Sequence, residues 1–88
     1  MRVFFHILTD AEPILDGEGS ELASLSEAEA EAKQTARDLM ADALRRGDYA
    51  PVHWQVQACS GDGSQLFSVS FWDCAIRQGA ERPAVRFG

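Results

Sequence analysis

Cysteine is scarce in this 88-residue sequence, which contains only Cys59 and Cys74. The two form no CxxC pair, and two cysteines cannot build the disulfide framework on which small secreted domains depend. Because buried cysteine usually behaves as a small hydrophobic residue, we expect two reduced, partly buried thiols. The cysteine content therefore argues against a redox centre.

Long hydrophobic runs are also missing, and none approaches the roughly 20 residues that a membrane-spanning helix needs. The opening segment, residues 1–8, contains His6 and is too short for the hydrophobic region of a signal peptide. It leads to Asp10 without a small-residue cleavage site. We therefore expect a cytoplasmic protein that has no role in a membrane.

Basic residues are outnumbered, with 8 Lys and Arg against 14 Asp and Glu and a formal net charge of −6. The imbalance lies in residues 1–31, where Arg2 is the one basic residue. An acidic surface repels phosphate backbones, so the charge disfavours binding to DNA or RNA. If the protein has a charged partner, a basic protein surface is favoured.

The overall composition is ordinary for a globular domain, with 45% hydrophobic and 25% charged residues. A chain of this length forms one small hydrophobic core. We expect a single domain over residues 1–76. Residues 77–88 carry Gly, Pro and arginines without periodicity, which predicts a flexible C-terminal tail.

Residues 26–46 predict one long amphipathic helix around which the rest of the chain is arranged. Ser24 with Glu27 fits a capping box, and Gly47 suits the left-handed residue that follows a helix. The apolar stripe, at helical spacing, consists of Leu25, Ala28, Ala32, Ala36, Leu39, Met40 and Ala43. Because most of these side chains are small, the helix should pack closely against a flat sheet.

Residues 2–8, 52–59 and 65–72 predict β-strands, because they are rich in β-branched and aromatic residues. Ile14-Leu15 predicts a short strand at the edge of the sheet, since Pro13 cannot donate a ladder hydrogen bond. The order β-β-α-β-β predicts an α+β two-layer domain. Its sheet is largely antiparallel, and one long helix packs on one face.

Asp62-Gly63, between the last two strands, is a strong hairpin signal. If these two residues form the loop, Gly61 faces Ser64 and the register of the hairpin is fixed. One face then carries the apolar side chains Trp54, Val56, Ala58, Phe67, Val69 and Phe71. The other face carries the pairs Cys59–Leu66, Gln57–Ser68, Gln55–Ser70 and His53–Trp72. The first face should form the core.

Two sets of side chains contain metal-ligating chemistry. The first set is acidic and lies in adjacent turns: Asp10, Asp16, Glu18 and Glu21. It does not match a calcium-binding loop, and turn formation explains such carboxylates. The second set is His6, His53, Cys59 and Cys74, which lack the closely spaced ligand pairs of zinc sites. No glycine-framed nucleophile turn is present. We therefore expect no metal, no cofactor and no enzymatic activity.

Several motifs resemble a family of small bacterial domains of unknown function. They are Phe4-Phe5-His6, Asp16 with Glu18-Gly19 and Glu21-Leu22, Glu31-Ala32, Ala36-Arg37-Asp38-Leu39, Ala41-Asp42-Ala43 and Phe71-Trp72-Asp73. The first resembles the family's YFFH-type strand, with Val3 in place of the first aromatic residue, and Ala23-Ser24 stands where the family usually has Pro-Asp. The resemblance spans residues 2–76 and implies neither an activity nor a cofactor.

The sheet face away from the helix is the candidate binding surface. Phe4, His6, His53 and Trp72 are expected there beside polar side chains, unless the tail or the second turn covers them. We favour a non-catalytic module that binds protein, first of all a second copy of itself, through this face or a free strand edge. The alternative is a single-stranded nucleic-acid binder that stacks bases on Phe4 and Trp72.

Overall fold

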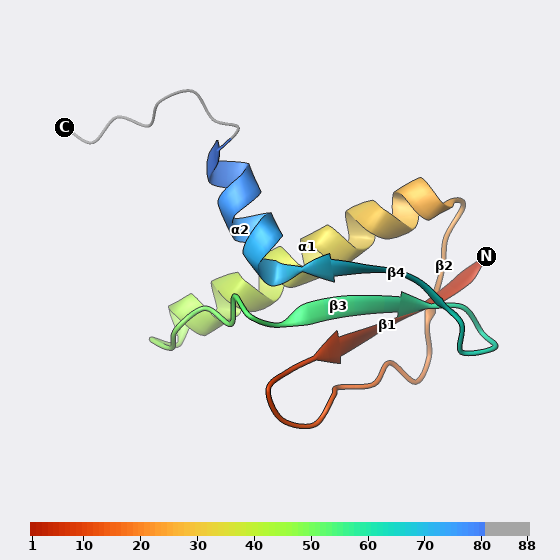
Figure 1. Cartoon of the computed structure of the whole chain (residues 1–88), viewed down its shortest axis with the longest axis horizontal. Helices are drawn as coiled ribbons and strands as arrows, with labels where there is room; N and C mark the ends of the chain where they lie inside the picture. Colours follow the sequence, from red (N-terminus) through yellow and green to blue (C-terminus); the bar gives the residue numbers. More distant parts are fainter. Residues whose placement is uncertain (81–88) are drawn as a thin grey trace.

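A four-stranded antiparallel sheet carries one long helix on one face, as the sequence predicts (Figure 1). The computed structural model describes residues 1–80, and side chains as far as Ala75. The elements are β1 Arg2–Leu8, β2 Ser20–Glu21, α1 Leu25–Arg45, β3 Gln55–Cys59, β4 Gln65–Ser70 and α2 Phe71–Ala80. The strands lie in the order β2-β1-β3-β4, so β4 forms one edge of the sheet.

Both ends of α1 are fixed by the residues that the sequence indicated. The Ser24 hydroxyl accepts the backbone N–H of Glu27 at 3.1 Å, and the Glu27 carboxylate accepts the N–H of Ala23 at 3.2 Å. At the other end, Gly47 has φ +86° and the N–H of Asp48 donates to the carbonyl of Ala43. The capping prediction is confirmed.

The alanine stripe of α1 allows the close approach to the sheet. Ala28, Ala32 and Ala36 are completely buried, and so are Val56 of β3 and Phe71, against which the stripe packs. Helix α1 lies over β3 more than over β4. Phe67 and Val69 on β4 therefore remain only partly buried although they face the helix layer.

The hairpin register is confirmed from Gln55–Ser70 to Ala58–Phe67 and then shifts by one residue. Cys59 lies opposite Gln65, so the predicted pairing of Cys59 with Leu66 is wrong. The reason is the loop, in which Ser60 pairs with Ser64 and Gly63 takes φ +92°. A three-residue loop with a left-handed glycine adds one residue compared with a two-residue turn.

The second strand lies elsewhere than predicted. Ile14 does pair with Ile7 through two hydrogen bonds of 2.8 Å, but this is an isolated bridge. Beyond this bridge the contact with β1 continues through the Asp16 carboxylate and then through β2, where Ser20 pairs with Val3. Leu15, between the two, is 69% exposed.

The C-terminal part differs most from the prediction. Strand β4 ends at Ser70, and residues predicted as strand and chain end form helix α2. The Ser70 hydroxyl accepts the N–H of Asp73 at 3.4 Å, in the manner of a helix cap, and Phe71 and Cys74 are buried. The predicted boundary between residues 76 and 77 falls within α2, and residues 81–88 of the predicted tail lie outside the described residues. Within the described part, neither helix has the length and apolar character needed to cross a membrane.

Candidate functional site

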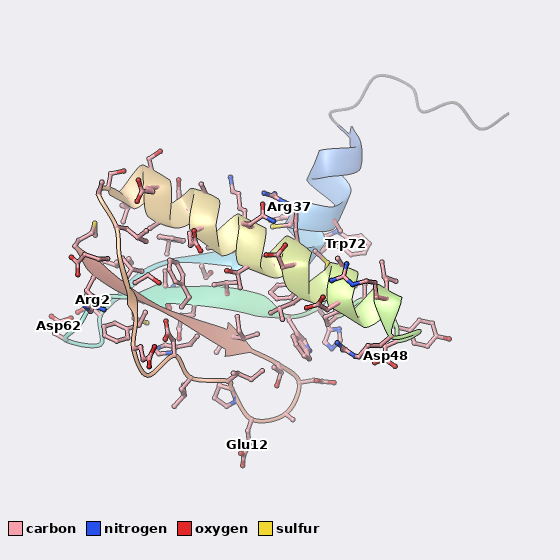
Figure 2. All side chains as sticks on the ribbon, turned by 180° about the vertical axis from the view of Figure 1, so that it is seen from behind. Arg2, Glu12, Arg37, Asp48, Asp62 and Trp72 are labelled. Carbon is pink, nitrogen blue, oxygen red and sulfur yellow. The ribbon has the colours of Figure 1, made fainter. Side chains whose placement is uncertain are left out.

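The four residues of the predicted binding face do not form one surface. Phe4 and His6 lie on the sheet face away from α1 and are partly buried, whereas His53 precedes β3 and is exposed. Trp72 belongs to the first turn of α2 and is 53% exposed (Figure 2). The expected pairing of His53 with Trp72 is therefore wrong, because the strand ends two residues before the tryptophan.

Asp16 fixes the turn that runs beside Phe4 and His6. Its carboxylate accepts the backbone N–H of Phe5 at 3.1 Å, of Glu18 at 3.1 Å and of Gly19 at 3.0 Å. Burial alone would raise the pKa of Asp16, but the hydrogen bonds from Gly19, Phe5 and Glu18 outweigh it and hold the pKa below its usual value. Asp16 thus takes the place of a strand partner at the edge of β1.

The same turn covers part of the far sheet face. The N–H of Asp16 donates to Nδ1 of His6 at 3.0 Å, which ties the turn to the side chain of β1. Gly19 has φ +73°, and a Cβ atom there would lie 3.0 Å from side-chain atoms of Arg2 and Phe4. The second turn therefore covers part of the far face, while covering by the tail concerns residues outside the described part of the chain.

The remaining acids of the turns have separate partners. The Asp10 carboxylate lies 3.5 Å from Nε2 of His53, and Glu21 pairs with the N-terminal amine at 3.2 Å and with Arg2 at 3.1 Å. The described residues contain no group of three or more His, Cys, Asp or Glu side chains arranged to hold a metal ion. These carboxylate contacts link the chain before and after β1 to Glu21 and His53.

Both cysteines are free and buried. Burial raises the pKa of the Cys74 thiol, and the positive charges of Arg37 and Lys33 offset only part of that effect. A thiol with a raised pKa is a weak nucleophile at neutral pH, because the thiolate is the reactive form. Cys74 is suited to packing between the helices.

A shallow apolar groove of about 350 Å³ lies between α1 and α2. Its described lining is mainly hydrophobic and includes Met40, Ala41, Leu44, Val52, Cys74 and Ala75, together with the charged Arg37. Sequence reasoning missed this groove because it did not anticipate α2. The i, i+3 spacing of Phe71 and Cys74 was the available signal, since these side chains share one face of a helix.

The outer side of β4 is a strand edge, the second kind of binding surface that the sequence analysis named without locating it. The outer side of β1 is occupied by Ile14, Asp16 and β2. Strand β4 pairs with β3 on one side, and on its other side no hydrogen bond from the described chain reaches its backbone. The strand Gln65–Ser70 contains neither a charged residue nor proline.

Comparison with known proteins agrees with the resemblance seen in the sequence. The model of one family, described as "Domain of unknown function (DUF6894)", matches residues 2–72. A search among curated proteins finds no match to the chain, and neither does a search among solved structures. The family match extends from β1 through the first two residues of α2, and so includes the whole sheet and α1. The chain therefore belongs to the DUF6894 family of domains of unknown function.

Proposed function

We propose that this domain is a non-catalytic interaction module that binds a second copy of itself through the outer edge of β4. The observation that carries the proposal is the outer edge of β4, a strand of six residues without charged side chains, with which no other strand of the described chain pairs. Folded proteins usually protect such edges with charged residues, proline or a covering segment, because an open edge is a template for another strand. Here the edge from Phe67 to Ser70 contains no charged residue and no proline, and no segment within residues 1–80 pairs with it.

A second copy is the simplest occupant of this edge. Two identical strands pair about a two-fold axis, so one self-complementary surface is sufficient. Pairing would satisfy the outward N–H and C=O groups of both strands and bury more of Phe67 and Val69, which α1 leaves partly exposed.

The sites described above support an interaction role better than a catalytic one. Among the described side chains, those that line the groove between α1 and α2 are apolar apart from Arg37, and none is a carboxylate or histidine. The carboxylates around β1 bind backbone N–H groups or neighbouring charges. An enzyme needs convergent acid, base or nucleophilic groups in a pocket, and these residues do not supply them.

The nucleic-acid alternative receives less support. It depends on Phe4 and Trp72 acting together as a stacking platform on one sheet face. Phe4 lies in β1 beside Gly19, whereas Trp72 lies in α2, which packs against α1. The net charge of −6 adds electrostatic repulsion.

Light scattering coupled to size-exclusion chromatography tests the proposal. The measured mass should be twice the 9.7 kDa of the chain at high micromolar loading and should fall as the sample is diluted. A mass of one chain throughout that range would overturn the proposal.

A further inference from the structure

We infer that two β4 strands pair in antiparallel orientation about a two-fold axis centred on Ser68, which joins the two four-stranded sheets into one. This inference rests on the proposed self-association and adds the register of the interface. It follows from the direction in which each backbone group of β4 points, from the distribution of apolar side chains and from the length of the strand.

The direction of the backbone groups follows from hydrogen bonds across the sheet. The N–H of Ile7 donates to the carbonyl of Ile14, and the carbonyl of Ile7 accepts the N–H of Ile14, both at 2.8 Å. Neither backbone group of Ile7 therefore points towards β3. Ile7 faces Val56, and in an antiparallel pair the residues alternate between hydrogen-bonded and non-hydrogen-bonded positions. The groups of Val56 therefore point towards β4, where they meet Val69.

The N–H and C=O of Val69 thus point inward to β3, and the N–H and C=O of its neighbours Ser68 and Ser70 point outward, away from the sheet. A second observation agrees with this assignment. The N–H of Phe71, two residues after Val69, donates inward to the carbonyl of Trp54 at 3.0 Å. Ser68 therefore presents both an N–H donor and a C=O acceptor at the middle of the free edge.

The strand length selects the register. Centring the axis on Ser68 pairs Leu66 with the partner's Ser70 and uses only residues of β4. Centring it on Val69 would draw Phe71 of α2 into the pairing. Centring it on Phe67 would place Gln65, which lies beyond the register shift of the hairpin, opposite the partner's Val69. The register at Ser68 pairs residues 66–70 and needs neither Phe71 nor Gln65.

This register also keeps each face of the extended sheet consistent. Phe67 lies opposite the partner's Val69, and both side chains face the helix layer, where each is partly buried in the single chain. Ser68 lies opposite the partner's Ser68 on the far face, where it is exposed. The pairing therefore buries apolar side chains on one face and leaves hydroxyl groups on the other.

Disulfide trapping measures the register directly. In the proposed pairing the two Ser68 Cα atoms lie about 5.5 Å apart, within the range that a disulfide spans. The Ser68→Cys variant should convert to a reducible dimer under oxidised glutathione, whereas the wild type should not, because Cys59 and Cys74 are buried. Ser64→Cys is the matched control, since two copies of residue 64 would lie roughly 27 Å apart at about 3.4 Å per residue.

The outcomes separate this inference from the proposed function. Nearly complete cross-linking of the Ser68→Cys variant, with little in the Ser64→Cys variant, supports the register. If the wild type is dimeric but Val69→Cys cross-links while Ser68→Cys does not, self-association stands and the register is overturned. If Ser68→Cys and Ser64→Cys behave alike while the wild type is dimeric, the β4 interface itself is overturned. A monomeric wild type overturns both proposals.

Discussion

Replacing Asp16 by alanine should destabilise the domain although the residue lies in a loop. The carboxylate accepts three backbone N–H groups, from Phe5, Glu18 and Gly19. A hydrogen bond to a charged group contributes about 1.5–3 kcal/mol, but water can replace the carboxylate at the exposed N–H of Glu18. We expect a loss of about 2 kcal/mol, mainly from the N–H of Phe5 in the edge of β1.

Thermal and urea unfolding followed by circular dichroism measure this loss. For a domain of this size, 2 kcal/mol corresponds to a fall in Tm of about 10 °C. Glu18→Ala is the matched control, because Glu18 contributes its backbone to the turn. Its N–H donates to Asp16 and its carbonyl accepts a hydrogen bond from Arg2, and the substitution keeps both groups. We expect the control to change the free energy of unfolding by less than about 0.5 kcal/mol.

The pH dependence gives a second, independent measurement. Because the pKa of Asp16 is lowered in the folded state, its contribution is present above the unfolded pKa of about 3.9 and is lost as pH falls through the folded pKa. The difference in stability between wild type and Asp16→Ala should therefore be constant near neutral pH and shrink in acid below about pH 4. Equal losses for Asp16→Ala and Glu18→Ala, or a difference that persists in strong acid, would refute this reasoning.

Two further predictions concern the core and the ligand class. Leu39→Ala should lower the free energy of unfolding by about 2 kcal/mol, because it leaves a cavity beside the buried cluster. Replacing the exposed Gln55 by alanine should change it little. Similar losses for both variants in urea melts would mean that the buried and exposed faces are misassigned. Generic single-stranded RNA or DNA should show no measurable binding at physiological salt, because the chain carries a net charge of −6. A fluorescence anisotropy titration measures this. Micromolar affinity that falls steeply with added salt would favour the nucleic-acid alternative.

The sequence predicted those parts of the fold whose signals are local. Helix α1 has its own caps in Ser24 and Gly47 and a stripe at helical spacing, so no distant contact is needed to locate it. The hairpin pairing from Gln55 to Ala58 follows from alternation and from a turn between the strands. Both features depend on neighbours a few residues away.

Other parts depend on contacts between distant residues. Phe71 and Trp72 continue the strand pattern in sequence, but Phe71 is completely buried next to Trp54, and the chain turns into α2 there. The turn over the far face depends on Asp16 reaching Phe5 across eleven positions of the chain. Neither contact leaves a periodic signal, so the sequence predicted neither helix α2, which contains Trp72, nor the position of Asp16 beside Phe5.

Sedimentation equilibrium of the wild type, Ser68→Pro and Ser68→Thr measures whether the edge of β4 is the dimer interface. Because the N–H of Ser68 points to the free edge, proline there removes no hydrogen bond to β3 and the fold should persist. Proline would, however, delete one N–H···O bond in each direction across the two-fold axis, about 2 kcal/mol in total, and so weaken the dimer roughly 30-fold. We expect dimers for wild type and Ser68→Thr, and for Ser68→Pro a folded protein that is largely monomeric at concentrations where the wild type begins to dimerise. If Ser68→Pro associates as tightly as the wild type, the edge of β4 is not the interface.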